Sequence, residues 1–149
     1  MINILHKSMK KRYRTRIMNK NNLKILQNNV QSLRPLETRE ELYTFLRKEN
    51  IAIASIQEIW IKINEEYKIK GYKFVKHCRK EGFGGVGILV REEIDFSELQ
   101  LPQWNPIEAI AIKTRNLANN IVVISIYVPP DSNLCSQVLG KTTDIFQFL

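Results

Sequence analysis

Two short apolar stretches, Leu23-Lys24-Ile25-Leu26-Gln27 and Ile51-Ala52-Ile53-Ala54-Ser55-Ile56, flank a helical pattern and decide the fold of this chain. The first stretch alternates with a period of two, which is typical of a short strand. The second is a continuous run of small apolar residues, which is typical of a strand covered on both faces. Between them, Leu42, Phe45 and Leu46 share one face of a helix. This strand–helix–strand order predicts the start of an α/β layer.

The sequence around the helix also predicts where it begins and ends. Thr38 and Glu41 stand in a capping-box arrangement, in which each side chain bonds an otherwise unpaired backbone N–H group of the first turn. The helix is therefore expected to start near Thr38. Asn50 tolerates the left-handed conformation that often ends a helix, so the helix is expected to end there.

The second half of the chain predicts strands in place of helices. Its strands are expected to pair as two hairpins: 72–77 with 86–90, and 107–113 with 121–128. Gly82-Phe83-Gly84-Gly85 lies in the first connection, and Asn119-Asn120 can form a tight turn in the second. Pro129-Pro130 stops the last strand. Thr143-Asp144 can cap a further helix, which is expected to begin at Ile145.

Composition excludes several classes of protein. The chain has 149 residues and 44% hydrophobic residues, which suits one domain, or a piece of a larger one, with a real core. No apolar run approaches the roughly 18 residues that a membrane span needs, so no membrane is expected as a partner. The cysteines, Cys78 and Cys135, form neither a metal-binding spacing nor a disulfide framework. A reducing intracellular compartment is the expectation that follows.

The formal net charge of +8 is concentrated at the start of the chain. The first 36 residues hold nine of the 23 Lys and Arg residues and no acid. We therefore expect a basic leader without fixed structure over 1–22 and a domain over 23–149. Such a leader can bind nucleic acid, address the chain to the nucleus or the mitochondrion, or do nothing specific. The residues expected to contact nucleic acid are Lys10, Lys11, Arg12, Arg14 and Arg16.

Three polar residues stand where apolar strands end: Asn29, Glu58 and Tyr127. Ligand sites in layered sheets gather at such strand ends, because the loops there converge on one rim. A carboxylate such as Glu58 suits Mg²⁺, which takes one or two protein carboxylates and keeps several waters. Ordinary structural roles remain open at this point: a solvated carboxylate, a turn asparagine and a half-buried tyrosine.

Four stretches in order give the chain a recognisable resemblance: Ile25-Leu26-Gln27-Asn28-Asn29-Val30-Gln31-Ser32-Leu33, Ile56-Gln57-Glu58-Ile59-Trp60, Gly82-Phe83-Gly84-Gly85-Val86-Gly87-Ile88-Leu89-Val90-Arg91 and Ile126-Tyr127-Val128-Pro129-Pro130. Together they resemble the endonuclease/exonuclease/phosphatase superfamily, and more narrowly the apurinic-type endonuclease domain of non-LTR retrotransposons. The resemblance covers roughly residues 23–149. It implies an α/β fold, the N-terminal portion of a four-layered α/β sandwich in which helices flank two mixed sheets, here incomplete.

The resemblance also implies roles and partners. Asn29 and Tyr127 match catalytic positions, Tyr127 being the residue that contacts the scissile phosphate. Glu58 matches the metal ligand for Mg²⁺, with Mn²⁺ as the alternative ion. DNA is the implied partner, with no small-molecule cofactor. Two neighbours depart from the pattern: Asn28 stands where relatives usually have Trp, and Ile59 where they often have Thr.

The family's Asp-x-Asn motif, later Asp and terminal His are not among the 149 residues. We therefore expect a fragment that is inactive by itself, and self-association through an inner sheet face that lacks its cover. Two alternatives stay open. The chain can be a non-catalytic nucleic-acid-binding module that acts through its basic leader, or it can belong to another branch of the superfamily, such as the inositol-phosphate phosphatases or sphingomyelinases.

Overall fold

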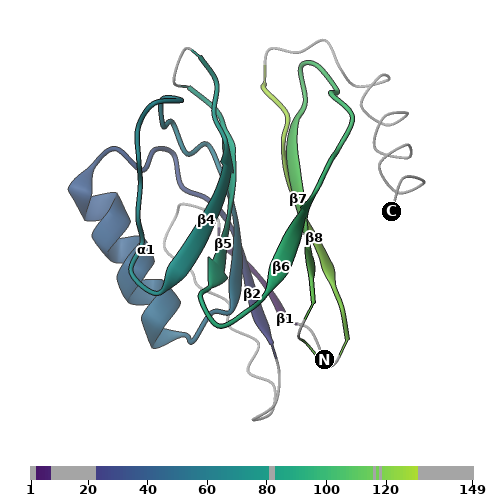
Figure 1. Ribbon diagram of the computed structural model, residues 1–149. Helices are drawn as coiled ribbons and strands as arrows, with labels where there is room; N and C mark the ends of the chain where they lie inside the picture. Colours follow the sequence, from purple (N-terminus) through teal and green to yellow (C-terminus); the bar gives the residue numbers. More distant parts are fainter. Residues whose placement is uncertain (1–2, 8–22, 81–82, 116, 118, 131–149) are drawn as a thin grey trace.

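Two β-sheets lie face to face, and one helix covers the outer face of the first (Figure 1). The structure is a computed structural model, and it describes residues 3–7, 23–80, 83–115, 117 and 119–130. Within these residues the layers are helix, sheet, sheet, which confirms the α/β class. No helix in the described residues is long and apolar enough to cross a membrane.

The first sheet, called sheet A, is mixed and has five strands. Its order is β1 (Asn3–Lys7), β2 (Lys24–Asn29), β3 (Ile53–Gln57), β5 (Val86–Arg91) and β4 (Tyr72–His77). The pairs β1–β2 and β2–β3 are parallel, whereas β5 pairs antiparallel with both β3 and β4. The strand–helix–strand order and the first hairpin are therefore confirmed. All five residues of β3 are buried, as its continuous apolar run predicts.

The second sheet, called sheet B, is antiparallel in the described residues. Its strands in spatial order are β6 (Phe96–Leu99), β7 (Glu108–Thr114) and β8 (Val122–Tyr127). The second hairpin is confirmed. Strand β6 was not predicted, because its four residues are intermediate or exposed and show no clear alternation. The helix expected from Ile145 lies outside the described residues.

Residues 3–7 differ from the expected unstructured leader. They form β1, which pairs in register with β2 from Asn3 opposite Lys24 to Lys7 opposite Asn28. The edge of β2 would otherwise present a row of unpaired backbone N–H and C=O groups, and pairing with β1 satisfies them. The rest of the leader, including its proposed nucleic-acid contacts, lies outside the described residues.

Helix α1 (Leu36–Lys48) starts earlier than the capping box predicts. Pro35 is its N-cap, with φ of −64°, and makes no side-chain capping hydrogen bond. Because the helix already begins at Leu36, Thr38 lies inside the first turn and is not the N-cap. Proline at this boundary costs no helical hydrogen bond, because the first N–H groups of a helix have no helical acceptor. The end of the helix is confirmed: Asn50 has φ of +52°, and Ile51 N–H donates back to Leu46 C=O over 2.9 Å.

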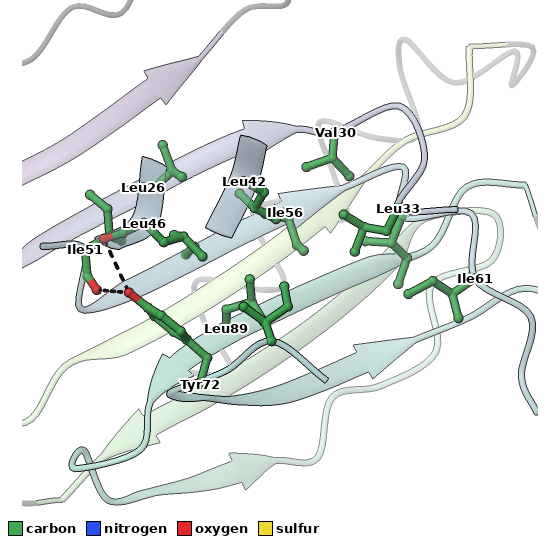
Figure 2. Packing of buried hydrophobic residues seen from close by; sticks show 13 residues of the cluster. Leu26, Val30, Leu33, Leu42, Leu46, Ile51, Ile56, Ile61, Tyr72 and Leu89 are labelled. Atoms are coloured by element: carbon green, nitrogen blue, oxygen red, sulfur yellow. Dashed lines mark hydrogen bonds between the residues drawn. The ribbon is translucent and has the colours of Figure 1, made fainter. Parts of the chain in front are cut away.

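The first core fills the space between α1 and sheet A (Figure 2). Its largest members are fully buried: Leu26, Leu33, Leu46, Ile51, Ile56, Ile59, Ile61 and Leu89. The hydroxyl of Tyr72 enters this core and donates to Ile51 C=O over 2.6 Å, with Leu46 C=O at 3.5 Å (Figure 2). Tyr72 therefore ties Ile51, three residues after the end of α1, to β4 at the edge of sheet A.

A second core lies between the sheets and overturns the expectation of an uncovered inner face. Apolar residues of sheet A and sheet B pack together there: Ile25, Ile53, Val75, Ile88, Val90, Ile112 and Val123. Sheet B thus covers the inner face of sheet A, and that face gives no support for self-association. Packing of two sheets over an apolar layer also fixes which strand ends lie near one another.

We predict that Tyr72→Phe lowers the free energy of unfolding by about 1 kcal/mol, because it leaves a buried backbone carbonyl without its donor. Urea unfolding at neutral pH measures the change. Since the ring stays in the core, a loss near the several kcal/mol of a large-to-small core substitution would contradict the hydrogen-bond explanation.

The same side chain predicts a dependence on pH. Burial raises the pKa of the Tyr72 phenol above its ordinary 10.0, although Arg91 opposes the shift. The folded state therefore holds this proton more tightly than the unfolded state, and the stability it contributes is present below pH 10 and lost as the pH rises through the folded pKa. Between pH 10.0 and the raised folded pKa, the unsubstituted chain should lose stability faster than Tyr72→Phe. Equal losses in urea series across this range would contradict the assignment.

Candidate functional site

The carboxyl ends of β2 and β3 bring two of the predicted site residues into contact. The strands are parallel and Asn29 pairs with Gln57, so the residue after β3, Glu58, arrives beside Asn29. Asn29 Nδ2 donates to Glu58 Oε1 over 2.7 Å, and Asn29 Oδ1 accepts the N–H of Gln31 over 3.2 Å. The amide of Asn29 is held at both ends and in turn orients the carboxylate of Glu58.

The backbone that carries Glu58 is strained. Glu58 and Trp60 have φ of +53° and +51°, in a region that costs an L-residue roughly 1–2 kcal/mol. Such strain persists only where the surroundings over-determine the conformation, and it is concentrated at functional sites. Here the carbonyls of Glu58 and Ile59 accept the N–H groups of Ser32 and Leu33 over 2.8 and 2.9 Å.

A pair of glycines holds the same backbone from the other side. Trp60 N–H donates to Gly84 C=O over 2.9 Å, and Ile59 N–H donates to Gly85 C=O over 3.4 Å. Gly85 has φ of +85°, and a Cβ there would lie 2.8 Å from Ile59 Cγ1 and 3.0 Å from His77 C=O. Glycine is therefore required by both conformation and space. We call Gly84–Gly85 the glycine turn below.

A buried polar network joins the two sheets directly behind Glu58. Gln57 Nε2 donates to Ser55 Oγ and to Ser125 Oγ, each over 3.0 Å, while Gln57 Oε1 accepts from Gln27 Nε2 over 2.7 Å. Ser125 Oγ donates to Ile56 C=O over 3.2 Å. A buried network with satisfied members is rigid, so it fixes β8 of sheet B against β3 of sheet A.

Tyr127 lies on sheet B at the edge formed by the carboxyl ends of β2 and β3 and the glycine turn, which we call the rim. It follows Ser125 by two residues on β8, so both side chains lie on the face that meets sheet A. Its ring atom Cε1 lies 3.3 Å from the position of a Cβ built on Gly84, whose carbonyl bonds the Glu58 segment. Tyr127 therefore borders the glycine turn, whereas Asn29 and Glu58 touch each other directly.

One charged residue of this rim escaped the sequence analysis. Glu108 is 5% exposed and stands opposite Tyr127 across β7 and β8. Its Oε2 accepts the N–H of Gly85 over 2.5 Å, and its Oε1 forms an ion pair with Arg79 Nε. The available signal was a carboxylate at the start of an apolar strand, which must find a donor or a cation if it is buried.

Asn28 departs from the resembled family and is also unusual in the structure. Its side chain is 3% exposed on β2, and its Oδ1 has no hydrogen-bond donor in the part of the chain described. An unpaired buried acceptor costs roughly 1–3 kcal/mol. The polar replacement beside Asn29 is thus a weak point of the core.

The donor set at Glu58 fits part of a site for a hard cation. One carboxylate oxygen is oriented by Asn29, and the Glu58 carboxylate makes no other hydrogen bond or ion pair with residues that the structure describes. Oxygen ligands of this kind suit Mg²⁺ and Mn²⁺. No group of three or more His, Cys, Asp or Glu side chains that could hold a metal occurs among the described residues, so Glu58 is not joined there by two further ligands of these kinds.

We predict that Gly85→Ala destabilises the chain more than Gly71→Ala does. Both glycines have positive φ, near +85° and +83°, but a Cβ at Gly71 meets nothing within 4 Å. Gly71→Ala should therefore cost about 1–2 kcal/mol, for conformation alone. Gly85→Ala should cost a further 1–3 kcal/mol or so for overpacking against Ile59. Urea unfolding of the two variants tests this, and equal losses would contradict the proposed close packing.

No protein-family model matches this chain, and no curated protein matches it. Among solved structures, it is similar to the endonuclease domain of TRAS1, a telomere-specific non-LTR retrotransposon, with 22% identity and a TM-score of 0.64 over 83% of this chain. It is also similar to an AP endonuclease from Archaeoglobus fulgidus, with 23% identity and a TM-score of 0.56 over 84% of this chain. The chain spans about half the length of each, 52% and 48%. What this chain shares with these two endonucleases is therefore their fold, as the resemblance implied.

Proposed function

We propose that this chain supplies part of the active site of a DNA endonuclease that depends on a divalent cation, Mg²⁺ or Mn²⁺. The observation that carries the proposal is the hydrogen bond between Asn29 and Glu58, on strained backbone at the edge of a fold shared with two endonucleases. Ligand sites of layered sheets are found at such edges. This geometry favours a role for the carboxylate beyond that of a solvated surface group.

Each residue has a distinct chemical part in this proposal. A bound cation would stabilise the charge that develops on the phosphate oxygens. Glu58 would hold that cation through the oxygen that Asn29 leaves available, and Asn29 would keep the carboxylate in one orientation. The Tyr127 hydroxyl would donate a hydrogen bond to the phosphate that is cleaved.

We infer further that the 149-residue chain does not cleave DNA by itself. Cleavage needs a base to activate the attacking water, and the proposed site residues are an amide, one carboxylate and a phenol. In the resembled family the base and the remaining ligands belong to motifs that this sequence does not hold. DNA as the partner makes the nucleus the first expected compartment, and the mitochondrion the second.

We predict that Mn²⁺ broadens the amide NMR signals of residues around Asn29 and Glu58, and that Glu58→Gln abolishes this broadening. The glutamine keeps the size and the hydrogen-bond acceptor but removes the negative charge that attracts the cation. Glu92→Gln is the matched control, because Glu92 is exposed and follows β5 at the end of that strand opposite Val86, which pairs with Gln57.

Two outcomes would contradict the proposal. Broadening that is the same in Glu58→Gln and in the unsubstituted chain would remove Glu58 as a ligand. Nicking of supercoiled plasmid in Mg²⁺ that disappears in Glu58→Gln would keep the ligand but overturn the inference that the chain is inactive alone.

The basic leader supports a second candidate function, nucleic-acid binding without catalysis. Nine basic residues and no acid among the first 36 residues give a local surplus of charge that can neutralise phosphates and release their counterions. This function needs neither a cation nor the Asn29–Glu58 pair. It therefore differs from the endonuclease proposal in which residues it requires.

We predict that replacing Lys10, Lys11, Arg12, Arg14 and Arg16 by Gln weakens binding to duplex DNA and flattens its salt dependence. The slope of log K against log salt should fall by about 0.9 for each phosphate that the variant no longer neutralises. Substitution is preferable to deletion, since deleting the leader would also remove strand β1. The control replaces five exposed lysines elsewhere: Lys48, Lys62, Lys68, Lys70 and Lys113. An equal reduction in both variants would show that total charge, and not the leader, governs binding.

A further inference from the structure

We propose that Arg79 binds a backbone phosphate of DNA at this rim, and that the buried carboxylate of Glu108 fixes Arg79 for that interaction. This inference rests on the proposed function, from which it takes DNA as the ligand. It adds Arg79 as a binding residue, which the resemblance does not assign. It depends on three features of the structure: the burial of Glu108, the position of Arg79 and the donors that Arg79 leaves available.

Glu108 is a fixed anchor. It is 5% exposed, and its two oxygens face the Gly85 N–H and the Arg79 guanidinium. A buried carboxylate without partners is strongly unfavourable, so losing either the Gly85 N–H or the Arg79 guanidinium would cost free energy. The Gly85 backbone cannot move away, because it also bonds Ile59. Arg79 is therefore attached to a rigid part of the molecule.

Arg79 lies beside the proposed site. It follows β4, and its Cδ lies 3.3 Å from the position of a Cβ on Gly84, the same distance as the ring of Tyr127. Arg79 and Tyr127 thus flank one glycine, and the Gly84 carbonyl bonds the segment that carries Glu58. A strand of DNA whose phosphate meets Tyr127 would have Arg79 within reach.

Arg79 also keeps donors for a ligand. A guanidinium has five N–H groups in a planar fork, and the ion pair with Glu108 is made through Nε. The side chain is 35% exposed and has no other partner among the residues that the structure describes. A fork held at one end and open at the other suits a phosphate, which accepts paired hydrogen bonds from arginine.

The alternative is that the Arg79–Glu108 pair is only a structural ion pair. The two explanations differ in the effect of removing the negative charge of Glu108. General electrostatics predicts that Glu108→Gln binds DNA more tightly, because a negative charge leaves a surface that meets phosphates. Positioning predicts weaker binding, because Arg79 loses the partner that holds it.

The experiment measures fluorescence anisotropy of a fluorescein-labelled DNA duplex with the full chain at several salt concentrations. Arg79→Gln should weaken binding roughly tenfold, as expected for removal of a charge-assisted hydrogen bond, and lower the salt slope by about 0.9. Lys80→Gln is the matched control, since it removes the same charge from the next, exposed residue. Its effect should be much smaller. Glu108→Gln should weaken binding, and adding it to Arg79→Gln should weaken binding no further.

Near-UV circular dichroism checks that each variant keeps its tertiary structure. If Glu108→Gln does not fold, Arg79→Lys takes its place: it keeps the charge but loses the fork, so its affinity should lie between those of the unsubstituted chain and Arg79→Gln. Equal effects of Arg79→Gln and Lys80→Gln, or tighter binding by Glu108→Gln, would overturn this inference and leave the proposed function untouched. No binding of the duplex by the unsubstituted chain would overturn it together with the DNA partner of the proposed function.

Discussion

The packing of the inner faces of the two sheets against each other is the constraint on which the rest of this molecule depends. Apolar packing brings the sheets together, but apolar surfaces can slide, and the polar network around Gln57 sets their register. Ser125 bonds both the side chain of Gln57 and the backbone of Ile56 across the interface. Since Glu58 directly follows Gln57 and Tyr127 lies two residues after Ser125, one network places both residues at the same rim.

The rim itself combines features that lower stability with features that hold them in place. Left-handed backbone at Glu58 and Trp60, and a buried carboxylate at Glu108, each cost free energy when considered alone. The glycine turn links them, because its carbonyls bond the strained segment and its Gly85 N–H bonds the buried carboxylate. The glycine turn thus holds the strained segment and the buried carboxylate in fixed positions relative to each other, and fixed polar groups are what a preorganised site requires.

Similarity of fold at low sequence identity is what this architecture predicts. Strand order and core packing need only apolar residues at the right period and turns that fit, and many sequences meet those conditions. The site depends on individual atoms, so its chemistry must be argued from Asn29, Glu58 and their neighbours. Asn28 illustrates the difference. Within the described residues its buried Oδ1 accepts no hydrogen bond, and the fold tolerates this beside the site.

Elements with strong local patterns could be predicted from the sequence, because the pattern of each lies within one segment. They include the helix face of Leu42 and Leu46, the buried strand β3 and the strand Tyr72–His77. The sequence also indicated that Asn29, Glu58 and Tyr127 stand at the ends of apolar strands. Three features could be found only in the folded chain: the pairing of β1 with β2, the strand β6, and the ion pair of Glu108 with Arg79. Those features join residues far apart in the chain, and their energies come from pairing, burial and desolvation, which no local pattern records.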